Sequence, residues 1–265
     1  MTLRPAGWYP DPDEPTRQRY WNGERWTDDF APHPPGYLAP RTAPFESARG
    51  LANATTGLLA VTGLLSIASA FVSFDRASRI GDFLGDPNSA SPSDLEGADD
   101  RVRAVAVLGL ASYLVTVIVF VVWFQRCYKN SQALGASNLR FSSGWAAGAW
   151  FVPFLNLVRP KQIADDIWKS TDPDAPALQT SSWMAARVPA LLHVWWAFFI
   201  AGFVVSRIVP SLANDYDTLS ELRTLDRVAA VTEIVTVIGA ILAALVVRAM
   251  TARGEQRAKN LGAAA

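Results

Sequence analysis

Two ionisable side chains, His193 and Glu233, lie inside long apolar runs of the sequence. A carboxylate or imidazole within a membrane is a candidate functional group, because its charge is costly there and its proton can exchange. The alternative is structural: Glu233 hydrogen-bonded to Ser or Thr or paired with Arg207 or Arg227, and His193 a hydrogen-bonded packing residue. The two side chains fall near opposite membrane faces, so we expect no shared proton relay.

A second set of polar and aromatic side chains marks the middle of the chain. This candidate inner-rim motif consists of Arg126, Asn130, Arg140, Trp150, Pro153, Asn156 and Arg159. Together with Lys161 its cations form a basic rim, which predicts binding to anionic lipid headgroups. A phosphorylated or otherwise anionic ligand is the alternative.

The pair Asp165 and Asp166 raises the question of a metal site. No His or further carboxylate stands at ligand spacing, and Lys161 and Lys169 lie four residues on either side of Asp165. We therefore expect ion pairs and no metal. The sequence also contains no catalytic or cofactor motif, so we expect a protein that is not an enzyme.

The N-terminal region combines aromatic residues with a turn signal. Its candidate partner-binding or peptide-binding residues are Trp8, Tyr9, Tyr20, Trp21 and Trp26. Asn22-Gly23 predicts a β-hairpin with a type I′ turn. The tryptophans predict either one binding surface for a Pro-rich peptide, which the run 34–37 would supply, or only a small folding core.

Long apolar runs must position these groups. Each run is about 20 residues, which is enough for a helix to cross a bilayer. The four runs are Leu51–Phe74, Arg103–Phe124, Val188–Val209 and Val228–Val247. We therefore predict an all-α membrane protein in which four transmembrane helices form two hairpins, preceded by the small β-hairpin module.

The apolar stretch Trp145–Val158 is too short to span and contains Pro153. We expect it to be re-entrant or interfacial, although a spanning segment is not excluded by the residues alone. Pro160 suits the first turn of a following amphipathic helix that would lie in the headgroup plane.

Charge predicts the orientation. Lys and Arg gather before the first run, between the second and third runs, and in the C-terminal tail, whereas segments 75–102 and 210–227 are rich in Asp and Glu. Because short cytoplasmic loops carry the excess of Lys and Arg, we expect a multi-pass plasma-membrane protein with both termini cytoplasmic.

Composition narrows the class of protein further. A single cysteine, Cys127, excludes an intramolecular disulfide. We expect no nucleic-acid partner, and we leave a homo-oligomer open.

The predicted units are the module at 5–32, a Pro-rich linker at 33–49, the helical domain at 50–250 and a basic tail at 251–265.

Two segments resemble known families. The run from Trp123-Phe-Gln-Arg126 through Trp150-Phe-Val-Pro153 to Ile167-Trp168 resembles an uncharacterised bacterial membrane family, domain of unknown function 4328, over about residues 50–250. The segment from Gly7-Trp8-Tyr9-Pro10 to Trp26-Thr27 resembles domain of unknown function 2510, over about residues 5–32. The second resemblance implies a high-GC Gram-positive source, and neither implies an activity.

Two functions are compatible with this organisation. The first is a membrane scaffold or sensor whose N-terminal module binds a protein partner. The alternative is an oligomeric conduit for a small solute or ion, for which polar pore-lining residues are scarce.

Overall fold

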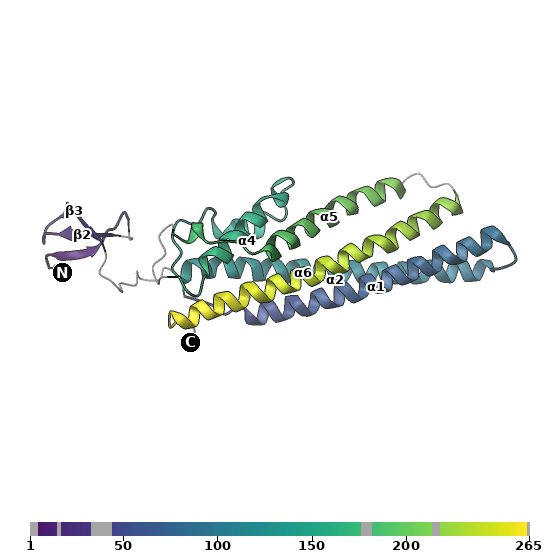
Figure 1. Cartoon of the computed structure of the whole chain (residues 1–265), viewed down its shortest axis with the longest axis horizontal. Coiled ribbons are helices and arrows are strands. Elements are labelled where there is room, and N and C mark those ends of the chain that lie inside the picture. Colours follow the sequence, from purple (N-terminus) through teal and green to yellow (C-terminus); the bar gives the residue numbers. More distant parts are fainter. Residues whose placement is uncertain (1–4, 15–16, 33–43, 176–181, 214–217, 264–265) are drawn as a thin grey trace.

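The computed structural model describes residues 5–14, 17–32, 44–175, 182–213 and 218–263, and omits the side chains of residues 182 and 206–213. A small sheet is followed by a bundle of long helices (Figure 1). The Pro-rich run 34–37 and Arg207, both singled out above, lie outside the described residues or side chains.

The N-terminal module is a three-stranded antiparallel sheet rather than a hairpin alone. Strands β1 (Gly7–Pro10), β2 (Arg17–Trp21) and β3 (Trp26–Pro32) lie in that order. The predicted turn at Asn22-Gly23 joins β2 to β3, but its loop has four residues, because Trp21 pairs with Trp26. The Asn22 side-chain oxygen accepts hydrogen bonds from the backbone N–H groups of Glu24 and Arg25, and Gly23 takes a φ of 101°.

The long helices extend well beyond the predicted apolar runs. They are α1 (Arg49–Gly85), α2 (Pro92–Ala133), α5 (Ala190–Ala213) and α6 (Leu219–Asn260). Capping boxes at Ser91 and Thr218 start α2 and α6 in polar sequence, because side chain and backbone satisfy each other's free groups there. Hydropathy located the apolar part of each helix and missed these polar turns.

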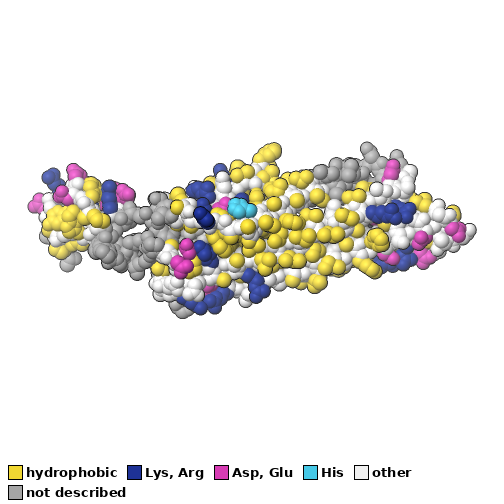
Figure 2. All heavy atoms as spheres, viewed as in Figure 1, with side chains coloured by type: hydrophobic (Ala, Val, Ile, Leu, Met, Phe, Trp, Pro, Cys, Tyr) yellow, Lys and Arg dark blue, Asp and Glu magenta, His cyan; other side chains and the backbone are white. Residues whose placement is uncertain are grey.

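Among the residues that the structure describes, three helices, α1, α2 and α6, are long and apolar enough to cross a membrane. Figure 2 shows hydrophobic side chains over the middle of the bundle, with charged side chains toward both ends. This is the pattern of a multi-pass membrane protein. The fourth predicted span falls on α5, whose apolar part within the described residues, Ala190–Val205, is shorter. The four-span prediction is thus confirmed for three helices.

Helices α1 and α6 pack along most of their length in opposite directions. Small residues on α1 make the approach close: a Cβ added at Gly63 would lie 4.0 Å from the Ala240 Cβ. Arg76 pairs with Asp226 at one end, and Ser47 contacts Glu255 at the other. The N-terminus of α1 and the C-terminus of α6 therefore share one end of the bundle, the proximal end. The opposite end is called distal.

The middle segment does not form a spanning helix. It consists of α3 (Ser143–Gly148), a turn, the 3-10 helix η1 (Leu155–Leu157) and α4 (Arg159–Ser170), with a second 3-10 helix, η2 (Ser182–Ala185), after it. Pro160 stands in the first turn of α4 as predicted. The apolar side of α4 faces protein rather than lipid, because Ile163 and Ile167 are buried in the core. Its amphipathic pattern thus has a packing reason, and its position in the headgroup plane stays a prediction.

The core lies in the proximal half of the bundle. Helices α1, α2, α3, α4, α5 and α6 all contribute to it, and its large buried members include Trp123, Phe124, Tyr128, Ile163, Leu192 and Met250. The Trp123 indole N–H donates to the Thr251 hydroxyl at 2.9 Å, so the donor of this buried ring is satisfied.

Candidate functional site

The chain enters the bundle through a clamped segment at the proximal end. The Asn130 side-chain amide donates to the Glu46 carbonyl at 2.7 Å and accepts from the Glu46 N–H at 3.2 Å. Arg126 forms an ion pair with the Glu46 carboxylate. Two of the inner-rim residues, Arg126 and Asn130, thus hold the N-terminal segment.

Glu255 of α6 completes this clamp from the opposite side. Its buried carboxylate accepts bonds from the Ser47 hydroxyl at 2.6 Å and the Ala48 N–H at 3.0 Å, and it pairs with Arg49 at 3.1 Å. A carboxylate at the start of α1 also stabilises the helix dipole. A small pocket of about 10 Å³ beside the segment has room for about one water molecule.

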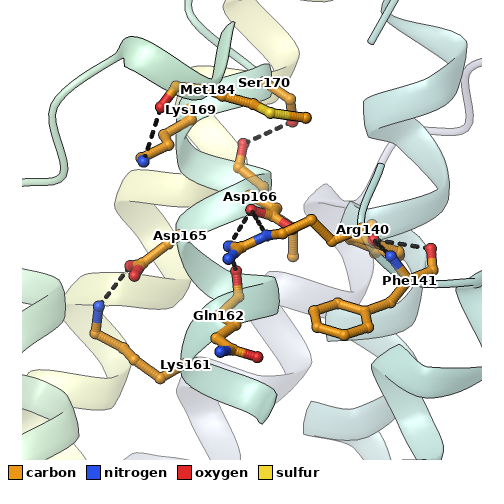
Figure 3. A network of polar contacts seen from close by, with 11 residues as sticks. Arg140, Phe141, Lys161, Gln162, Asp165, Asp166, Lys169, Ser170 and Met184 are labelled. Atoms are coloured by element: carbon orange, nitrogen blue, oxygen red, sulfur yellow. Dashed lines mark hydrogen bonds and ion pairs between the residues drawn. The ribbon is translucent and has the colours of Figure 1, made fainter. Parts of the chain in front are cut away.

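Arg140 and Asp166 form a second polar centre (Figure 3). The Arg140 guanidinium contacts both carboxylate oxygens of Asp166, at 2.5–3.0 Å, and donates to the Gln162 carbonyl at 3.0 Å. The Asp166 side chain is only 1% exposed. Burial raises the pKa of Asp166 above its usual value, although hydrogen bonding and the positive charge of Arg140 act in the opposite direction. The same carboxylate raises the pKa of Arg140.

The neighbouring carboxylate has a different partner. Asp165 pairs with Lys161 at 2.5 Å, as the four-residue spacing predicted (Figure 3). The two adjacent acids point to different cations, an arrangement that supports the ion-pair interpretation of this sequence. Nothing in the sequence indicated the Asp166 ion pair, because its partner Arg140 lies 26 residues earlier in the chain.

A buried arginine in the C-terminal part of α6 was missed by sequence reasoning. Arg257 is 1% exposed and donates to the backbone carbonyls of Leu134, Asp172 and Ala175, at 3.1, 2.6 and 3.2 Å. Burial lowers the pKa of Arg257. The arginine ties the ends of α2 and α4 to α6, because cations satisfy carbonyls at helix C-termini. The predicted basic tail is in this respect part of the helical domain.

The remaining inner-rim residues belong to the hairpin that joins α3 to α4 and to the first residue of α4. Trp150 packs edge-on against aromatic rings of α2 and α5, including Phe120 at 5.2 Å and Phe199 at 5.6 Å. Pro153 and Asn156 lie in the turn and in η1. The Arg159 guanidinium lies over the Trp145 ring, 4.1 Å from its centroid. The motif is therefore split among the clamp, the Arg140 centre and this hairpin.

The aromatic residues of the module are divided between the two faces of its sheet. Trp8 pairs with Tyr20 in the register and contacts it edge-on at 5.2 Å. The neighbouring Tyr9 contacts Trp26 at 6.3 Å, and Trp26 contacts Trp21 at 5.3 Å. Because side chains alternate along a strand, the single aromatic surface expected from the sequence becomes two.

The two intramembrane ionisable residues are not brought together. His193 is exposed near the start of α5, whereas Glu233 is half-buried in α6, closer to the distal end. Within the described part of the chain, neither makes a hydrogen bond or ion pair. The pairing of Glu233 with Arg227 is thus not seen, and that with Arg207 lies outside the described side chains.

A bundle of long apolar helices behind a small aromatic sheet defines a multi-pass helical membrane protein. The chain belongs to the family described as Domain of unknown function (DUF4328), whose model matches residues 86–252. Residues 6–37 match a second model, Protein of unknown function (DUF2510). Both resemblances are confirmed, although the first match begins after α1 and the second extends to Tyr37. No curated protein and no solved structure matches the chain.

Proposed function

We propose that this protein is a non-enzymatic membrane scaffold or sensor whose N-terminal module binds a protein partner. One observation carries the proposal: Trp8 is 44% exposed, on the face of the sheet opposite the Tyr9–Trp26–Trp21 cluster. That cluster can serve as the folding core without Trp8. An exposed tryptophan beside a tyrosine is a frequent anchor for a protein ligand.

The clamp supports the same function. Residues 33–43 connect the module to the segment held by Asn130 and Glu255. Eleven residues span at most about 40 Å, so the module would remain within that distance of one fixed point of the bundle. A scaffold requires such a fixed attachment.

We further propose that α5 is a fourth span, which would give two hairpins of helices. The C-terminal end of α4 lies at the proximal end, where Arg253 donates to the Trp168 carbonyl. Helix α6 begins at the distal end, where Asp226 meets Arg76. The chain must cross the bundle between these points, and α5 has 24 residues, or about 36 Å of helix.

For orientation, we propose that the proximal end faces the cytoplasm of a bacterial plasma membrane, with both termini inside. Support comes from the exposed cations of the proximal half, Lys129, Arg187 and Arg248, which among the described residues have no acidic partner. In this orientation residues 145–158 enter the cytoplasmic leaflet from its inner surface.

The ligand that the exposed Trp8–Tyr20 face fits best is a Pro-rich peptide, since aromatic pairs hold extended proline segments. The test uses the full chain in nanodiscs and a synthetic peptide of residues 32–44. We expect a Kd between about 1 µM and 1 mM, because the site is small. Trp8→Ala should abolish binding. Phe30→Ala is the matched control, because Phe30 is equally exposed at 44% but stacks under Arg17 on the other face. Equal binding by both variants would remove the Trp8 face as the site.

A conduit is the second candidate, and one feature favours it. The Thr62 hydroxyl lies 2.9 Å from Ser112 and 3.1 Å from Thr116, between the apolar parts of α1 and α2. The packing of α1 against α2 can also account for these hydroxyl contacts, because hydroxyl side chains often hydrogen-bond between membrane helices. Ion or solute flux in liposomes, lost in Thr62→Val, would favour an oligomeric conduit. Flux equal to that of empty liposomes would favour the scaffold.

A further inference from the structure

The hairpin between α3 and α4 presents an apolar tip. Phe151 is 67% exposed and Phe154 is 84% exposed, and Val152 and Val158 are also exposed. Phe154 has a φ of 63°, which is unusual for a residue other than glycine. A large aromatic ring held outward on a strained backbone is a candidate functional feature. Figure 1 shows this segment standing out from the side of the bundle, next to the start of α5.

Aromatic contacts at the base of the tip fix its position along α2 and α5. Trp150 packs on Phe120 of α2 and on Trp196 and Phe199 of α5. Phe120 lies between Ile118 and Val122, which are 63% and 45% exposed on the apolar surface of α2. The residues that directly follow Trp150 are therefore at the level of a surface that must face hydrocarbon if α2 spans the membrane.

A cation lies where the hairpin returns to the bundle. The Arg159 guanidinium rests on the rings of Trp145 and Phe141, at 4.1 and 5.2 Å from their centroids. Its neighbours Arg140 and Lys161 are each paired with an aspartate. Within the described residues Arg159 has no carboxylate partner. An arginine on aromatic faces keeps its N–H donors free for an anion.

We propose that residues 149–158 form a wedge inserted in one membrane leaflet, and that Arg159 binds the phosphate of a glycerophospholipid at its base. The inference rests on the proposed membrane embedding of α2 and α5 and adds the lipid-binding residue. Apolar side chains in the acyl region with an arginine at headgroup level match the chemistry of a phospholipid, whose chains are apolar and whose phosphate is anionic.

Depth is tested with an environment-sensitive fluorophore attached at position 154. Phe154→Cys is made in a Cys127→Ala chain and placed in nanodiscs whose lipids carry bromine in the acyl chains. We expect quenching by the brominated lipids and none by aqueous iodide. Val115→Cys on α2 is the lipid control, because Val115 is 47% exposed, and Asn88→Cys in the distal loop is the water control. Iodide quenching at 154 with lipid quenching at 115 overturns the wedge alone. Loss of lipid quenching at 115 overturns the membrane embedding itself.

The phosphate site is tested with the same label. Bromine is carried either by phosphatidylglycerol or by phosphatidylcholine, present as a minor component. One arginine near the surface is worth about 1 kcal/mol, so we expect about five-fold enrichment of the anionic lipid near position 154. Arg159→Gln should bring the two lipids close to equal quenching, whereas Arg248→Gln, an exposed cation of α6, should keep the preference. Unchanged preference in Arg159→Gln, or no preference in the parent protein, overturns the site.

Discussion

The carboxylate of Glu255 accepts a hydrogen bond from the backbone N–H of Ala48, 207 residues earlier in the chain. A side chain from the last turns of α6 thus caps the N-terminus of α1. Because Ala48 has no side-chain acceptor of its own, this cap depends on a distant residue. The end of the helical domain therefore stabilises its start.

Replacing Glu255 with Ala should loosen the start of α1. The Ser47 hydroxyl and Ala48 N–H lose a charged acceptor in a buried place, which costs about 2 kcal/mol. Hydrogen exchange of the backbone amides of residues 44–52 should accelerate. Arg49→Gln is the control, because its side chain is 57% exposed and the pair it breaks contributes little. Equal exchange in Glu255→Ala and the parent protein would contradict the cap.

Removing Arg140 should damage the fold more than removing Asp166. In Arg140→Gln the buried Asp166 carboxylate loses its partner, which costs about 3 kcal/mol of unfolding free energy. In Asp166→Asn the arginine remains partly solvated, since its side chain is 42% exposed. Denaturant unfolding in detergent gives the order, and the reverse order would show that Asp166 does not depend on Arg140.

The same pair predicts a pH dependence. Burial raises the pKa of Asp166, so the folded state binds its proton more tightly than the unfolded state. Stability then falls as pH rises from the usual Asp value of 3.8 to the raised value. Arg140→Gln removes the opposing influence and widens this window, so the variant should regain stability as pH is lowered from 7 toward 4. The double variant with Asp166→Asn should lose this dependence.

The module should show the opposite response to acid. Asp11 is buried, and although burial raises its pKa, the Arg17 bond at 2.7 Å and the Asp13 N–H lower it overall. A lowered pKa stabilises the sheet at pH above the usual 3.8, and this stability is lost as pH falls through the folded value. The protection of the backbone amides of residues 7–14 and 17–32, measured as exchange relative to the intrinsic rate at the same pH, should fall below about pH 4. Asp11→Asn should make exchange faster at pH 7 and flatten its acid response.

Cysteine labelling tests the proposed topology. In a Cys127→Ala chain, Asn88→Cys should react with a membrane-impermeant maleimide added outside cells, and Gln256→Cys should react only after lysis. Ser142→Cys reports the middle segment and should behave like position 256. External labelling at 142 or 256 would place the proximal end outside and reverse the proposed orientation.

Local chemistry made part of this fold predictable. The length of the apolar runs indicated α1, α2 and α6, Asn22-Gly23 indicated the turn between β2 and β3, and Pro160 indicated the start of α4. These signals depend on neighbours in sequence. The type I′ geometry failed because the pairing of Trp21 with Trp26 sets the loop length.

The candidate site was predicted less well, because its partners are far apart in sequence. Asn130 was expected only as a member of the inner rim, yet in the structure it holds Glu46, 84 residues away. Arg257 looked like a solvated tail residue, and only the packing of three helix ends shows that it is buried. Single-sequence patterns contain no information on such pairings.

The bond pattern of Asn130 has a consequence for how such chains diversify. Its amide contacts only main-chain atoms of Glu46, which every amino acid except proline presents in the same form. These two hydrogen bonds therefore tolerate almost any side chain at position 46, although the ion pair with Arg126 requires an acid there. Recombination that replaced the sequence before position 46 would thus leave both Asn130 bonds intact, without any change in the helices.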